Sequence, residues 1–114
     1  MIIAIPVTEG QLSGHFGHCD QFLVYDVKDS ASEINCVTEM VPPPHEPGVI
    51  PKWLYENGVN VVIAGGIGAK AKTIFEKYNI EVLSGADNTV EVGKLVEQYI
   101  NGSLETSDAT CNKH

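Results

Sequence analysis

The chain has 114 residues and a formal net charge of −8 at pH 7, and all 7 of its basic residues are lysines. Because it carries no arginine, it lacks the forked donors that bind phosphate and guanine, so nucleic acid is not expected as a partner. Hydrophobic residues make up 43% of the chain, which is enough for one core. No apolar run approaches the roughly 20 residues that a membrane span needs.

The cysteines and the N-terminus indicate a reducing compartment. The apolar first residues lack the basic region and the cleavage site of a signal peptide, so we expect a cytoplasmic protein. Cys19, Cys36 and Cys111 are an odd number with no paired spacing, which argues against a disulfide framework. An odd number of cysteines therefore favours a metal or redox role for one of them.

The first half of the chain predicts three strands. The apolar run at residues 2–7 is typical of a buried strand, and residues 8–21 follow as a loop that carries glycine and histidine. Residues 22–28 and 33–41 alternate in polarity around a turn and predict a hairpin. Cys36 lies in the second strand of this hairpin, where we expect an inert buried thiol.

The second half of the chain predicts alternating helices and strands. The pattern favours helices over 49–58, 68–79 and 88–103, and strands over 59–66 and 80–85. Asn88 or Thr89 is the expected N-cap of the last helix, and Gly102 its stop signal. This order predicts one α/β domain over residues 1–102, with helices on the faces of a mixed sheet. Residues 103–114 are polar and aperiodic, and we expect a flexible tail.

The stretch "SGHFGHCDQF", residues 13–22, gathers the first candidate metal ligands. His15, His18 and Cys19 supply imidazole nitrogen and thiolate sulfur, the ligands preferred by zinc, copper, iron and iron–sulfur species. Three ligands suit an open site, or a cluster that brings its own inorganic ligands. The alternative is a solvated loop without special chemistry. Asp20 is either an orienting partner of a histidine or a simple loop carboxylate.

His45 stands alone inside the proline-rich stretch "PPPHEPG", residues 42–48. A rigid proline frame fixes where a side chain points, which lowers the entropy lost when it binds a ligand. If the strand at 2–7 is central, its carboxyl end and that of the strand at 33–41 point the same way. We therefore expect His45 to lie near the loop at 8–21, although an incidental surface histidine is the alternative.

The stretch "AGGIGAKA", residues 64–71, follows a buried strand and opens a helix. Its glycines match the form of a dinucleotide-binding turn, but no acidic residue follows where a ribose would be bound. We interpret it as a tight strand-to-helix turn whose N–H groups contact an anionic ligand, with Gly65, Gly66 and Gly68 as the candidate contacts.

Together these stretches resemble the dinitrogenase iron–molybdenum cofactor biosynthesis family (the NifB C-terminal, NifX and NafY type). The resemblance covers roughly residues 1–102 and rests on "SGHFGHCDQF", "PPPHEPG" and "GVNVVIAGGIGAKAKTIFEKYNIEV". It implies a ribonuclease H-like motif: a five-stranded mixed sheet of order 3-2-1-4-5 with helices on both faces. It also implies that the chain binds or carries iron–sulfur or molybdenum-containing clusters.

The resulting hypothesis is a non-catalytic carrier of a metal–sulfur cluster, or of a single transition metal ion. Its metal ligands would be His15, His18, Cys19 and His45, and its partners the proteins that donate and accept the cluster. The residues also allow a thiol-dependent enzyme that uses Cys19 as nucleophile, or a small scaffold protein without metal. The sequence leaves open a homodimer and a part in ligation for Cys111 and His114.

Overall fold

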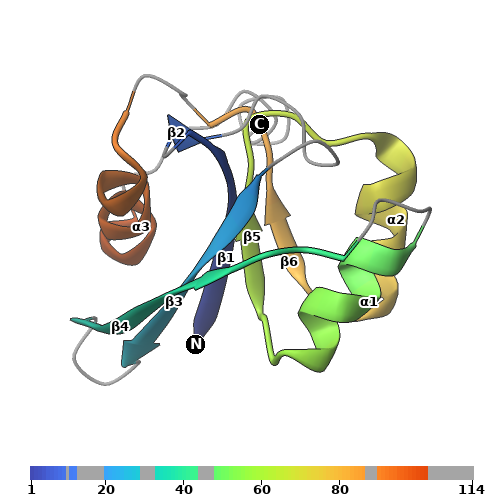
Figure 1. The fold of residues 1–114 in the computed structure, drawn as a ribbon, viewed down its shortest axis with the longest axis horizontal. Coiled ribbons are helices and arrows are strands. Elements are labelled where there is room, and N and C mark those ends of the chain that lie inside the picture. The colour runs from blue at the N-terminus through green and yellow to red at the C-terminus, as the bar shows by residue number, and fades with distance from the viewer. Residues whose placement is uncertain (10, 13–19, 29–32, 44–47, 87–89, 103–114) are drawn as a thin grey trace.

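The fold is an α/β arrangement of one mixed sheet and three helices (Figure 1). It is seen in a computed structural model, which describes residues 1–9, 11–12, 20–28, 33–43, 48–86 and 90–102. The strands in this part of the chain are β1 (Ile2–Thr8), β2 (Gln11–Leu12), β3 (Gln21–Lys28), β4 (Glu33–Met40), β5 (Val61–Ile63) and β6 (Glu81–Leu83). The helices are α1 (Val49–Glu56), α2 (Ala69–Lys77) and α3 (Val92–Asn101).

The strand order is β4-β3-β1-β5-β6, with β2 paired to β1 beside this path. β1 is antiparallel to β3 and parallel to β5, so the sheet is mixed. The order of the five predicted strands is therefore confirmed. The predicted number of strands is wrong, because the described residues form a sheet of six. The additional strand, β2, lies within the predicted loop at 8–21. It has two residues, and a strand of this length is too short to show a periodicity in the sequence.

The central position of β1 explains its unbroken apolar sequence, since both of its faces are covered. Ile3, Ile5 and Val7 point to one face, where they pack with α3. Ala4 points to the other face, where it packs with α1 and α2. Figure 1 shows α3 alone on one side of the sheet and α1 with α2 on the other. Helices on both faces were predicted, and this part of the fold class is confirmed.

Three details differ from the sequence predictions. Cys36 is exposed, not buried, because β4 is the outermost strand of the sheet. α3 begins at Val92 with Glu91 at its N-cap, so the predicted cap at Asn88 or Thr89 is wrong. β5 and β6 have three residues each and are shorter than the strands predicted at 59–66 and 80–85.

Each helix ends two residues before the end of its predicted range, but the local signals at two helix ends act as expected. Gly102 follows α3 in the left-handed conformation, with φ of 77°, which confirms it as the stop signal. Pro51 lies in the first turn of α1, where its missing N–H has no helical partner to lose.

Among the described residues, no helix has the length and hydropathy of a membrane span.

Candidate functional site

The ends of four strands define one edge of the sheet, which we call the carboxyl edge. β1, β5 and β6 are parallel, and β4 has the same direction because β1 and β4 are both antiparallel to β3. Figure 1 shows β1, β5 and β6 running toward the upper side of the molecule. Ligands of open α/β sheets bind beyond the carboxyl ends of the strands. The stretch 13–22 follows β2, which pairs with the end of β1, and the other two stretches follow β4 and β5, so all three begin at this edge.

The segment 13–19, which carries three predicted ligands, has both of its ends beside one residue of β1. Before it, Leu12 pairs with Val7. After it, the Asp20 N–H donates to the Val7 carbonyl at 2.9 Å, and Gln21 also pairs with Val7. A chain of this length with its ends held together reaches at most about 14 Å from its base. The two ends of the segment are fixed beside Val7, and a common position for the three candidate ligands stays a prediction.

The segment that carries His45 is also anchored at both ends. Met40 ends β4 and lies two strands away from Pro6 of β1, a separation of about 10 Å. At the other end, a Cβ added to Gly48 would lie 3.9 Å from Cδ1 of Ile74, so this end rests against α2. The segment therefore spans from an outer strand to the helix that follows the glycine turn.

The glycine turn, residues 65–68, is hydrogen-bonded to the residues that follow β6, and the space around its last residue is unfilled. The Gly65 carbonyl accepts the Gly85 N–H at 3.1 Å, which extends the pairing of β5 with β6. Gly68 precedes α2 in an extended conformation, with φ of −74° and ψ of 157°, and no side chain caps the helix there. A Cβ on Gly68 would meet no heavy atom within 4 Å. Neither backbone conformation nor packing therefore requires a glycine at this position.

The start of α2 is electrostatically suited to an anion. No acidic residue lies in its first turn, where Lys70 is exposed. The partial positive charge of a helix N-terminus and its free N–H groups both favour a negatively charged ligand.

Tyr25 lies on the other face of the sheet, where it packs with α3. Burial, and then the charge of the Glu91 carboxylate, raise the pKa of Tyr25, so that its phenol stays neutral.

The structure describes only part of the predicted ligand set. His15, His18, Cys19 and His45 lie outside the described residues, so their mutual reach stays a prediction, and the same holds for Cys111 and His114. Within the described part of the chain, no three His, Cys, Asp or Glu side chains are grouped to hold a metal ion. Gly65, Gly66 and Gly68 are described and lie at the carboxyl edge.

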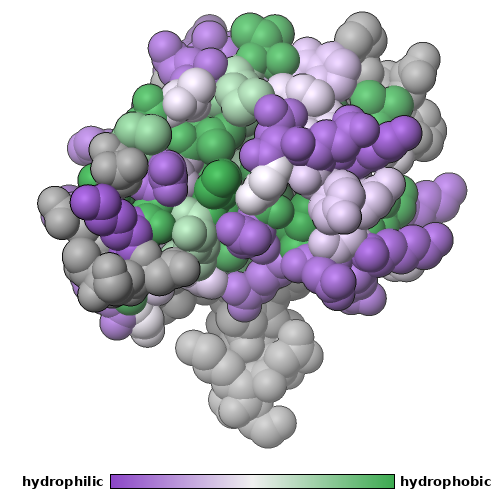
Figure 2. Space-filling model, turned by 90° about the horizontal axis from the view of Figure 1, so that it is seen from below, coloured by the Kyte–Doolittle hydropathy of each residue, from purple (hydrophilic) through white to green (hydrophobic). Residues whose placement is uncertain are grey.

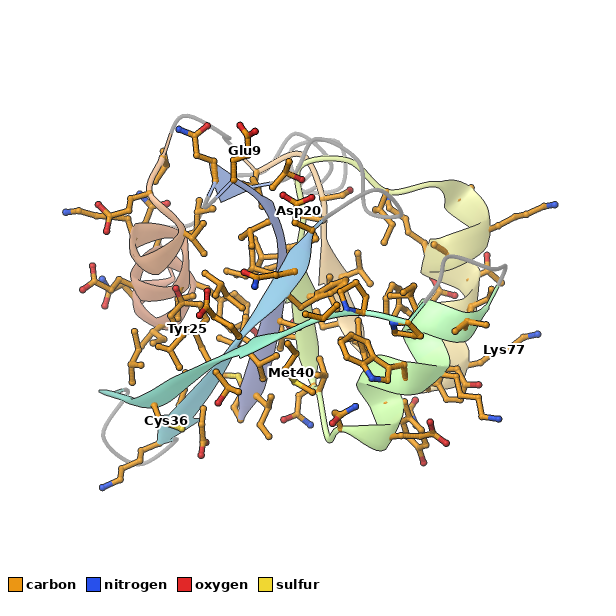
Figure 3. All side chains as sticks on the ribbon, in the orientation of Figure 1. Glu9, Asp20, Tyr25, Cys36, Met40 and Lys77 are labelled. Carbon is orange, nitrogen blue, oxygen red and sulfur yellow. The ribbon has the colours of Figure 1, made fainter. Side chains whose placement is uncertain are left out.

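Sequence reasoning missed the contact that closes the base of segment 13–19. The Asp20 carboxylate accepts the backbone N–H of Glu9 at 3.2 Å, and both side chains lie at the carboxyl edge (Figure 3). Asp20 was predicted either to orient a histidine or to be a simple loop carboxylate, and the observed partner is a backbone group. The dipeptide Glu9-Gly10 after an apolar strand is a weak hairpin signal that would have pointed to β2.

These features define a single-sheet α/β protein with a loop-built candidate site at the carboxyl edge. Comparison with known proteins identifies its family. Residues 1–102 match the family described as dinitrogenase iron–molybdenum cofactor, and the chain belongs to that family. The resemblance inferred from the sequence is thereby confirmed.

Relatives share this fold along nearly their whole length. The uncharacterized protein MJ0580 of Methanocaldococcus jannaschii is 30% identical over 108 residues, which cover 92% of this chain and 90% of that protein. The crystal structure of PH0822 is similar with a TM-score of 0.84 at 25% identity, covering 94% of this chain and 95% of that one. The apo form of the orange protein from Desulfovibrio gigas is similar with a TM-score of 0.73 at 20% identity, covering 93% and 92%.

Proposed function

We propose that the chain is a non-catalytic carrier that binds a metal–sulfur cluster, iron–sulfur or molybdenum-containing, or a single transition metal ion. Membership of the dinitrogenase iron–molybdenum cofactor family supports a role in handling such cargo. The geometric observation that supports the proposal is that both described ends of segment 13–19, Leu12 and Asp20, are bonded beside Val7 near the carboxyl end of β1.

In this proposal the cargo is held from two sides. His15, His18, Cys19 and His45 supply nitrogen and sulfur ligands to the metal. The turn of Gly65, Gly66 and Gly68 contacts the anionic part of the cluster through the N–H groups at the start of α2. Histidine and thiolate bind metals in their deprotonated forms, so affinity is expected to fall below about pH 6.

The carrier role implies partners and a place in the cell. We propose that proteins which donate and accept the cargo approach the carboxyl edge, and that the chain acts in the cytoplasm. In this proposal residues 1–102 act as one domain of the ribonuclease H-like type. The similar orange protein of Desulfovibrio gigas was solved in an apo form, which shows that its fold forms without a bound group.

The test is anaerobic reconstitution with ferrous iron and sulfide. The wild-type protein is expected to take up metal and gain cluster absorption, and Cys19→Ala/His45→Ala is expected to lose most of both. Cys36→Ala is the matched thiol control, because Cys36 is exposed on β4 away from the carboxyl edge (Figure 3). Removal of residues 103–114 tests whether Cys111 and His114 take part in ligation, because their loss would then lower the metal content. If the double variant retains the metal content and spectrum of the wild type, the ligand assignment is wrong.

A further inference from the structure

Asp20 makes two hydrogen bonds at the base of segment 13–19. Its backbone N–H donates to the Val7 carbonyl at 2.9 Å, and its side-chain Oδ2 accepts the Glu9 N–H at 3.2 Å. Figure 3 shows Glu9 and Asp20 close together at the carboxyl edge. The residue that ends the segment is therefore bonded to the turn that precedes it.

Glu9 has an unfavourable backbone conformation. It is the first of two residues that join Thr8 to its partner Gln11, and its φ is 53°. Two-residue hairpin turns with positive φ favour Asn, Asp and Gly, and other residues in the left-handed region lose about 1 kcal/mol or more. Such conformations persist only where the surroundings hold them. The Asp20 carboxylate does so through a charge-assisted hydrogen bond to the Glu9 N–H.

We propose that Asp20 is a positioning residue for the metal site, an inference that rests on the proposed function. By holding the turn at Glu9, its carboxylate fixes the pairing of β2 with β1, and so the direction in which the chain leaves Leu12. Its backbone N–H fixes the point at which the chain returns to β3. Both ends of the ligand-bearing segment thus depend on one exposed residue, the first end through its side chain and the second through its backbone N–H.

The experiment measures the affinity for Co²⁺ under anaerobic conditions through its thiolate charge-transfer absorption. Asp20→Ala removes the acceptor and is expected to weaken Co²⁺ binding about tenfold, as is common for groups that orient metal ligands. Asp20→Asn keeps an acceptor oxygen and is expected to stay within about threefold of the wild type. Asn adopts the left-handed conformation at lower cost, so adding Glu9→Asn to Asp20→Ala is expected to recover most of the loss.

Glu81→Ala is the matched control for charge and for a lost hydrogen bond. Glu81 accepts the Tyr99 hydroxyl at 2.6 Å at the opposite end of the sheet. Its loss is expected to lower the thermal midpoint and leave Co²⁺ affinity unchanged. Thermal unfolding of every variant separates loss of fold from loss of site. If Asp20→Ala does not fold, Asp20→Ala/Glu9→Asn is expected to restore both fold and affinity, and its failure overturns the inference.

The outcomes distinguish this inference from the proposed function. If the wild type takes up no Co²⁺, iron or cluster, the carrier function is wrong and the positioning role is lost with it. If the wild type binds Co²⁺ and Asp20→Ala binds it equally well, the carrier function stands and the role of Asp20 is wrong. If Asp20→Asn is as weak as Asp20→Ala, the charge of Asp20 matters rather than its hydrogen bond, and positioning is overturned.

Discussion

The two edges of the sheet are built differently. At the edge opposite the carboxyl edge, which we call the amino edge, α1 leads into β5 and α2 into β6 through connections of the same design. The Val59 N–H donates to the Leu54 carbonyl, and the Ile80 N–H to the Phe75 carbonyl. Each bond closes a helix end around a residue in the left-handed conformation, Gly58 in one case and Asn79 in the other.

At the carboxyl edge the connections are longer and the helix starts less protected. In the described residues, α1 and α2 have glycine at the N-cap, and the Glu91 side chain at the N-cap of α3 accepts no backbone N–H of its helix. Viewed from the amino edge, the half of the surface over α1 and α2 is covered mainly by hydrophilic side chains (Figure 2). The helix ends at the amino edge are closed by backbone hydrogen bonds, whereas the helix starts at the carboxyl edge have no side-chain cap, as the proposed ligand site requires.

Gly58→Ala is expected to have the largest effect on stability and none on metal uptake. Gly58 has φ of +80°, where a Cβ is strained, although it would meet Cδ1 of Ile2 at an ordinary 3.6 Å. The expected loss is about 1–2 kcal/mol of unfolding free energy, or roughly 5–10 °C in thermal midpoint.

Gly93→Ala is the control for that substitution. Gly93 lies within α3, and its added Cβ would be 4.0 Å from the Tyr25 hydroxyl, an ordinary contact. This variant is expected to gain about 0.5–1 kcal/mol, because alanine favours the helix. A thermal midpoint of Gly58→Ala equal to that of the wild type would show that the amino edge tolerates a side chain there.

The second prediction concerns the contact between Tyr99 of α3 and Glu81, the first residue of β6. The Tyr99 hydroxyl donates to Glu81 Oε1 at 2.6 Å, and burial, this hydrogen bond and the Glu81 charge raise the pKa of Tyr99 to about 12. A raised pKa means that the neutral phenol is favoured in the folded state. Its contribution is therefore complete below pH 10 and is lost as the pH rises through about 12.

Tyr99→Phe removes this contribution. It is expected to cost about 0.5–1.5 kcal/mol near neutral pH, and the difference from the wild type is expected to shrink as the pH approaches 12. Urea unfolding at about pH 8 and about pH 11 measures both. A difference that stays constant across this range would mean that Tyr99 packs against β6 without a hydrogen bond that matters.

The sequence predicts the amino edge and the two faces well, because their signals are local and periodic. The stripe of Val92, Leu95 and Val96 specifies the buried side of α3, and the β-branched run around Val62 specifies a central strand. Exact strand ends are less predictable, because apolar residues such as Ala64 remain buried after the strand has ended. Cys36 was mispredicted because alternation alone cannot say which strand lies at the edge of the sheet.

The candidate site is predictable only in its composition. The sequence shows that soft ligands gather near His18 and that a lone His45 follows a later strand. The strand directions place the described residues that precede both loops at the carboxyl edge, and the approach of His45 to His18 stays a prediction. The hydrogen bond between Glu9 and Asp20 joins residues 11 apart, and no pattern in the sequence indicates it. Contacts of this kind depend on where the folded backbone passes, which short-range periodicity does not encode.

The smallest expected effect on stability is also the sharpest test of the contrast between the edges. Gly68 stands where an aspartate or asparagine would cap α2, and its backbone conformation and open surroundings accept either. Gly68→Asp is expected to raise the unfolding free energy by about 0.3–1 kcal/mol, because a carboxylate complements the helix dipole. The same charge would repel an anionic cluster, so uptake of iron and sulfide is expected to fall.

Gly68→Asn separates the cap from the charge. It is expected to give a stability gain of a few tenths of a kcal/mol and to lose less metal than Gly68→Asp does. Thermal unfolding and iron analysis of both reconstituted variants measure the two effects. If Gly68→Asp gains stability and keeps its full metal content, the start of α2 does not face the cargo. The glycine turn would then be a strand-to-helix connection, and the cargo would be held by the histidine and cysteine loops alone.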